Sequence, residues 1–143
     1  GSGVRHSEFN PSANERTELY QVWMEPKERG GDPLYSEKKL GHGTVSNELK
    51  LLFSGNGREE STEIRQDAEF FFGQLDQDRA IVLRPEPDLP HVWIQVVSGK
   101  LQADQTQLEQ ADGLAIEEMD QALKLRAKEC CSFFVFRLPP DQE

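Results

Sequence analysis

The stretch HVWIQVVSGKLQ, residues 91–102, carries the clearest fold signal in the chain. Its first seven residues are rich in valine, isoleucine and tryptophan, which favour β-strands. The dipeptide Ser98-Gly99 follows directly, and a second strand-like run begins at Lys100. A two-residue turn of this kind between two strand-like runs predicts a β-hairpin.

Further strand-like segments lie on both sides of this stretch. Turn signals separate them, among them Gly55-Asn56-Gly57 and Ala111-Asp112-Gly113. Short strands at this spacing predict an all-β sandwich or barrel. Residues 105–125 are the helical alternative, and Gly113 within them argues against a long helix. The predicted strands are residues 48–54, 69–76, 80–85, 91–97, 100–104, 113–118, 121–128 and 131–138.

The chain of 143 residues is acidic, with 16 Lys and Arg against 26 Asp and Glu and a formal net charge of −10. Such a surface repels phosphate backbones and anionic lipid, so we expect neither nucleic acid nor membrane as a partner. The two cysteines, Cys130 and Cys131, are adjacent, and a disulfide between them would be strained. Two free thiols fit a reducing cytoplasm, which is the expected location, while secretion stays open.

The N-terminal residues suggest a metal site. In GVRHSEF, residues 3–9, His6 and Glu8 are two positions apart, so on a strand both side chains would face the same way. Imidazole nitrogen and carboxylate oxygen suit Fe(II), Mn, Ni or Zn. The spacing alone also fits a solvated surface pair. Beyond this pair, residues 17–26 (TELYQVWMEP) alternate like a strand, and residues 27–47 indicate a linker with one short strand near Tyr35.

These segments together resemble a known family, the pirin-like bicupins, which include bacterial pirin-like quercetin 2,3-dioxygenases. Residues 1–26 are similar to the end of the first cupin domain, and HVWIQVVSGKLQ, ADGLAIEE and SFFVFRLPP to the second. The resemblance implies a jelly-roll barrel of the RmlC-like double-stranded β-helix type. It divides the chain into residues 1–40, remnant strands of the first cupin plus a linker, and residues 41–143, the C-terminal cupin domain.

The resemblance also implies a metal site of three histidines and a glutamate, usually holding iron, in the first cupin. His6 and Glu8 match one histidine and the glutamate, and Glu8 is also a candidate base toward a substrate hydroxyl. The His-x-His pair that completes the family site would fall before residue 1. We therefore expect weak or no quercetinase activity from the chain, with Fe(II) or another divalent metal as the family cofactor. The alternatives are a non-catalytic protein-binding module and a truncated fragment of a bicupin.

Other polar residues are weaker candidates for metal ligands. Glu86, Asp88 and His91 precede or open a strand, either as remnant polar positions of a second barrel that binds no metal or as a proline-braced loop. His42 lies between two glycines and is expected to be an exposed loop residue.

The N-terminal strands also predict self-association. Unpaired strand edges and an apolar face that includes Leu19, Val22, Trp23 and Met24 would invite another chain. We expect a homodimer, or another chain, to cover these strands, and strand exchange about a twofold axis is one route. The alternative is a monomer in which residues 1–40 fold back on their own barrel.

Overall fold

The computed structural model describes residues 3–40 and 45–140. Within those ranges its regular structure consists of strands and one short 3-10 turn, Arg58–Glu60. The all-β prediction is confirmed, and residues 105–125 form strands rather than a helix. No helix in the described ranges is long and apolar enough to cross a membrane. The strands are β1 Glu48–Ser54, β2 Thr62–Glu63, β3 Glu69–Leu75, β4 Ala80–Leu83, β5 His91–Ser98, β6 Leu101–Ala103, β7 Thr106–Leu108, β8 Gly113–Ile116, β9 Leu123–Ala127 and β10 Cys131–Leu138.

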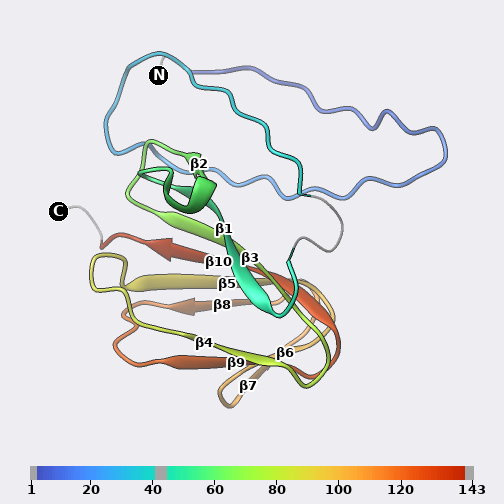
Figure 1. The fold of residues 1–143 in the computed structure, drawn as a ribbon. Helices are drawn as coiled ribbons and strands as arrows, with labels where there is room; N and C mark the ends of the chain where they lie inside the picture. The colour runs from blue at the N-terminus through green and yellow to red at the C-terminus, as the bar shows by residue number, and fades with distance from the viewer. Residues whose placement is uncertain (1–2, 41–44, 141–143) are drawn as a thin grey trace.

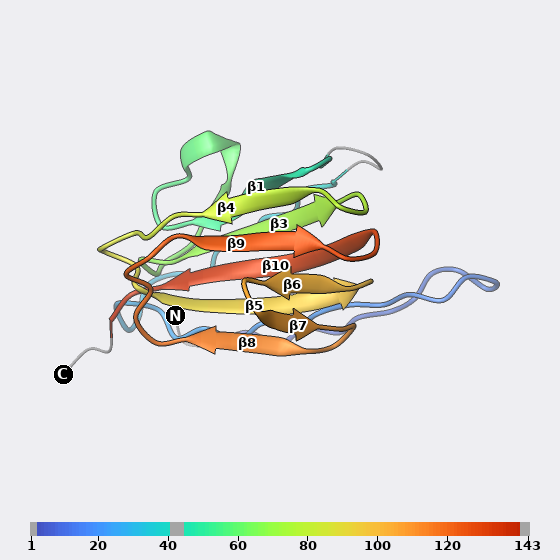
Figure 2. The ribbon, with the colours of Figure 1, turned by 90° about the horizontal axis from the view of Figure 1, so that it is seen from below.

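The strands form two sheets that pack face to face. The six-stranded sheet has the order β2-β1-β3-β10-β5-β8, and the four-stranded sheet has the order β4-β9-β6-β7. Figure 1 shows the two layers edge-on, and Figure 2 shows them from below with the four-stranded sheet in front. From β3 onward the chain passes to the other sheet at every connection except the one between β6 and β7. This alternation winds the chain around a shared core, as in a jelly roll.

The predicted hairpin at Ser98-Gly99 is wrong. β5 pairs with β10 and β8 in the six-stranded sheet, whereas β6 pairs with β9 and β7 in the four-stranded sheet. The hairpin lies one connection later, where Ala103 pairs with Thr106 across a two-residue turn. The sequence around Gly99 therefore marks a crossing between sheets.

Gly99 makes this crossing possible. Its φ is 73°, a left-handed backbone conformation that residues other than glycine rarely adopt. A Cβ at this position would overlap the carbonyl oxygen of Cys130 and lie 2.9 Å from its carbonyl carbon. The chain thus turns in direct contact with the backbone that leads into β10.

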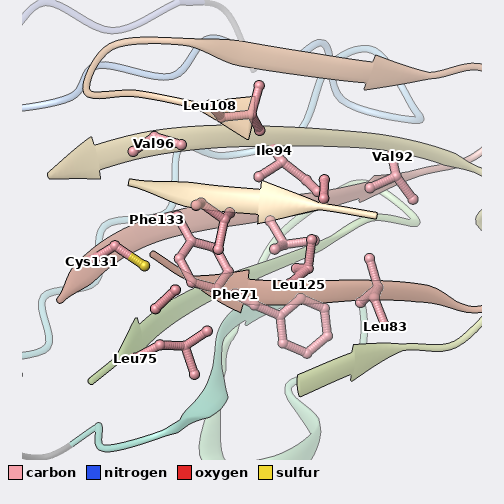
Figure 3. Packing of buried hydrophobic residues seen from close by; sticks show 14 of the residues in the cluster. Phe71, Leu75, Leu83, Val92, Ile94, Val96, Leu108, Leu125, Cys131 and Phe133 are labelled. Atoms are coloured by element: carbon pink, nitrogen blue, oxygen red, sulfur yellow. The ribbon is translucent and has the colours of Figure 1, made fainter. Parts of the chain in front are cut away.

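The core fills the space between the two sheets, and Figure 3 shows its central side chains. Alternate residues of each strand point inward, so strands that look half apolar supply a continuous apolar layer. Phe133 of β10 and Leu125 of β9 meet there from opposite sheets, and both are fully buried. Burial of apolar surface at about 25 cal/mol per Å² makes this layer the main source of stability. Other core residues are Leu51, Phe71, Leu75, Leu83, Val92, Ile94, Val96, Leu101, Leu108, Cys131 and Val135.

Residues 3–40 contain no strand, so the predicted strands at 17–26 and near Tyr35 are wrong. A strand needs a partner to satisfy its backbone groups, and in the described ranges this segment forms no ladder. Its path is extended and lies along the outer side of the six-stranded sheet (Figure 1). Residues 25–27 contact the loop between β2 and β3 of the same chain: Lys27 N donates to Arg65 O at 2.8 Å, and Gln66 Nε2 donates to Glu25 O at 2.9 Å.

Candidate functional site

The predicted ligand pair lies on the N-terminal segment. His6 and Glu8 are both exposed, on extended backbone that belongs to no strand. The His6 Nε2 atom is 3.0 Å from Gln21 Nε2. The contact joins the His6 ring to the Gln21 side-chain amide on the neighbouring leg of the segment. Because neither His6 nor Glu8 lies on a strand, the strand geometry that would hold both side chains on one face is missing.

Among the residues that the structure describes, no third ligand joins this pair. Within residues 3–40 and 45–140, no three His, Cys, Asp or Glu side chains gather as a metal site would require. His42, the loop candidate, lies outside the described residues. His91 opens β5 and belongs to the outward-facing series that includes Trp93. The segment of Glu86 forms a tight turn in which Leu89 N donates to Glu86 O at 2.9 Å, which fits the proline-braced loop.

An ion-pair cluster that sequence reasoning missed lies at one end of the sandwich interior. Glu69 of β3 is directly opposite Arg137 of β10, and Arg137 Nη1 is 3.7 Å from Glu69 Oε2. Arg58 reaches the other carboxylate oxygen, with Nη2 at 2.6 Å and Nε at 2.9 Å from Oε1. Arg137 also donates from Nη2 to Arg84 O at 2.8 Å, and its guanidinium lies 5.5 Å from the centre of the Phe71 ring.

This cluster determines the electrostatics of the interior. The Glu69 and Arg137 side chains are each only 12% exposed, and burial lowers the pKa of Arg137. A divalent cation next to Glu69 would meet the positive charges of two guanidinium groups, an arrangement opposite to that of a metal site. The alternation of inward-facing and outward-facing residues along each strand is the sequence signal that could have predicted the cluster. Glu69 is in step with Phe71, and Arg137 is in step with Phe133 and Val135, all on the inward side.

A second feature is the outward side of the six-stranded sheet, which we call the aromatic face. It consists of Phe70, Phe72, Trp93, Phe134 and Phe136, with Phe53 of β1 at its border. Phe70 and Phe136 have ring centres 4.8 Å apart, and Phe72 and Phe134 have ring centres 5.6 Å apart. Such contacts are typical of buried aromatic side chains, yet Trp93 is 40% exposed.

The N-terminal segment covers part of this face. The Tyr20 ring packs edge-on against Phe134, with centres 5.4 Å apart. A groove of about 470 Å³ lies between the segment and the sheet, lined by Tyr20, Val22, Met24, Phe53 and Phe70. A neighbouring groove of about 390 Å³ is lined by Trp23 of the N-terminal segment and by Trp93 and Phe136 of the sheet, among others.

Comparison with known proteins agrees with the fold. The family model described as the quercetinase C-terminal cupin domain matches residues 51–138, which include all strands from β3 to β10. The chain belongs to the pirin-like cupin family.

Among its relatives, the quercetin 2,3-dioxygenase of Escherichia coli (strain K12) is 36% identical over 140 residues, which are 98% of this chain and 58% of the relative. A putative quercetin 2,3-dioxygenase of Pasteurella multocida is 32% identical over 96% of this chain and 58% of that protein. The crystal structure of the bacterial pirin YhhW of E. coli in complex with nickel(II) superposes with a TM-score of 0.73 and 30% identity. That match covers 81% of this chain and 48% of YhhW. The chain thus spans about half of the length of these relatives, and that family includes a member with bound divalent metal.

Proposed function

We propose that this chain acts in flavonol dioxygenation as a C-terminal pirin-type cupin that contributes two metal ligands and is not a working quercetinase by itself. The relatives named as quercetin 2,3-dioxygenases support the reaction class. The observation that carries the proposal is the isolation of His6 and Glu8, which are exposed on an unpaired segment and share no cluster with a third ligand in the described ranges.

The donor types suit the metal, but their number does not. An imidazole and a carboxylate are ligands for Fe(II) or Ni(II). Open-site metal enzymes hold the ion with at least three protein ligands, so two donors would leave the ion mostly to water. Glu8 is the candidate base toward a substrate hydroxyl, a role that requires a substrate held within hydrogen-bond reach.

A flavonol assay tests the proposal. The chain is incubated with Fe(II) or Ni(II) and quercetin, and loss of the flavonol absorbance is followed together with oxygen uptake. We expect rates no higher than with the free metal, while the E. coli relative provides the reference for the assay. Rapid flavonol cleavage by the metal-loaded chain, lost on His6→Ala, would contradict the proposal.

A second candidate function is a non-catalytic protein-binding module. The aromatic face favours it, because large exposed aromatic surfaces mark interaction sites.

A further inference from the structure

The exposed turn that follows β1 holds the side chain of Asn56 in a defined position. Its Oδ1 atom accepts a hydrogen bond from Arg58 N at 3.1 Å and a second one from Ser54 Oγ at 3.2 Å. Ser54 Oγ also lies 2.7 Å from Ser61 Oγ, and both serines are buried. Because hydrogen-bond donors polarise the group that accepts them, the side-chain carbonyl of Asn56 is made more electrophilic at Cγ.

Gly57 places a backbone nitrogen beside this carbonyl. Only the carbonyl carbon, Cα and Cβ of Asn56 separate Gly57 N from Asn56 Cγ, so a bond between these two atoms closes a five-membered ring. Among the residues that the structure describes, none accepts a hydrogen bond from Gly57 N. Glycine has no side chain to hinder the approach, and the nearest atom to a Cβ placed at Gly57 would be 3.7 Å away.

We propose that Asn56 is a site of spontaneous deamidation in the folded chain. Gly57 N loses its proton and attacks Cγ of Asn56, a carbon–nitrogen bond forms, and the side-chain nitrogen leaves as ammonia. Water then opens the resulting succinimide at one of its two carbonyl carbons. One opening leaves an aspartate, and the other leaves an isoaspartate, in which the main chain runs through Cγ. Water is the co-reactant of the sequence.

The three other asparagines of the chain lack this combination. Asn10 precedes Pro11, whose nitrogen has no proton to lose. Asn14 and Asn47 each precede a glutamate, whose side chain crowds the attacking nitrogen. Asn47 is also held in place, since its Nδ2 donates to Asp76 Oδ2 at 2.8 Å and its Oδ1 accepts from Asp76 N at 2.9 Å. These residues are therefore internal controls within the same molecule.

The two products should affect the loop between β1 and β2 differently. An aspartate keeps a side-chain oxygen for Arg58 N and Ser54 Oγ, so the turn can persist. An isoaspartate lengthens the main chain by a methylene group and displaces the carboxylate, so this loop should open. Either product adds a negative charge to a groove of about 600 Å³ that Asp67 and Asp88 also line, and like charges there repel.

Peptide mapping of the aged chain by mass spectrometry tests the proposal. The folded chain is incubated at neutral and at mildly alkaline pH beside a synthetic peptide of residues 52–62, which serves as the time reference. We expect the segment with Asn56 to gain the mass that separates an acid from an amide, with both isoaspartate and aspartate present. The gain should be faster at the higher pH, because the attacking nitrogen must lose its proton. Asn10, Asn14 and Asn47 should keep their amides in the same samples.

Gly57→Ala gives the matched variant. It should slow the conversion of Asn56 about tenfold or more, because the added methyl group hinders ring closure. Asn47 reports on the fold of this variant, since its contacts with Asp76 are lost on unfolding. An Asn56 that keeps its amide in the folded chain while the synthetic peptide converts would overturn the proposal. Conversion of Asn14 as fast as that of Asn56, or an unchanged rate in Gly57→Ala, would overturn it as well.

Discussion

Glu69 and Arg137 face each other across β3 and β10 inside the sandwich, with Arg137 Nη1 3.7 Å from Glu69 Oε2. Both charges are largely removed from water, and Glu69 Oε2 and Arg137 Nε have no hydrogen-bond partner among the described residues. The pair is therefore held by mutual neutralisation, with Arg58 as a second cation on the same carboxylate.

Breaking this pair should destabilise the fold. Glu69→Ala leaves the largely buried Arg137 guanidinium without its carboxylate, while the more exposed Arg58 keeps its ion pair with Glu59. We expect the free energy of unfolding to fall by about 3 kcal/mol. The double variant Glu69→Leu with Arg137→Leu should recover much of the loss, because it buries no unpaired charge. Urea unfolding measures both.

The control for this prediction is an exposed pair of the same type. Arg126 Nη2 lies 2.9 Å from Asp78 Oδ1, with side chains 45% and 67% exposed. Arg126→Ala should cost at most about 1 kcal/mol. Equal losses at the two sites would show that the interior pair is no more important than a surface one.

Gly99→Ala should be among the most damaging single-methyl changes. The new Cβ would overlap a backbone carbonyl at Cys130, which cannot move without displacing β10. Gly57→Ala is the matched control, because Gly57 has a similar φ of 65° but its nearest neighbour would be 3.7 Å away. We expect about 1 kcal/mol of destabilisation at Gly57 and at least about 3 kcal/mol at Gly99, measured by thermal unfolding. Similar losses at both positions would mean that backbone strain alone is responsible.

The two adjacent thiols should react differently. Cys130 is exposed, whereas burial raises the pKa of Cys131 from 9.0 to about 11. At pH 8 the thiolate fraction of Cys131 falls about a hundredfold, so iodoacetamide should modify Cys130 first, as read by mass spectrometry. In guanidinium chloride the two should react alike. Faster labelling of Cys131 in the folded chain would contradict its buried position.

The same shift predicts a pH effect on stability. The raised pKa favours the neutral thiol in the folded state, so this contribution is present below pH 9 and is lost as the pH rises through about 11. Urea unfolding of the chain and of Cys131→Ala should therefore differ less at pH 11 than at pH 8. An unchanged difference would exclude Cys131 as the titrating group.

The strands after Glu48 were predictable because each carries its own signal. Alternation and turn residues are local, and they located all the longer strands of both sheets. The sheet that each strand joins could not be predicted from its local sequence. Ser98-Gly99 has the composition of a hairpin turn, but β5 joins β10, which follows some 30 residues later along the chain. β6 lies in the other sheet because it pairs with β9, a strand distant in the sequence, as well as with β7.

The errors at the N-terminus have a different cause. Residues 17–26 alternate like a strand, but alternation indicates only which side chains would share a face. It does not show whether a neighbouring strand is available for pairing. His6 and Glu8 remain predicted ligands, suggested by their spacing and by the family resemblance. Their placement on one strand face depended on strand pairing that this segment lacks. The sequence analysis did not consider Glu69 and Arg137, although both alternate in step with inward-facing residues of their strands.

The central claim is that two ligands on an unpaired segment do not hold a catalytic metal. Its most direct test is metal retention: the chain is loaded with Ni(II), desalted, and analysed for metal per chain. We predict near-zero retention, unchanged by His6→Ala, because water would occupy most coordination positions and the ion would exchange away. Retention of one nickel ion per chain, or one per two chains, that disappears with His6→Ala would contradict the account.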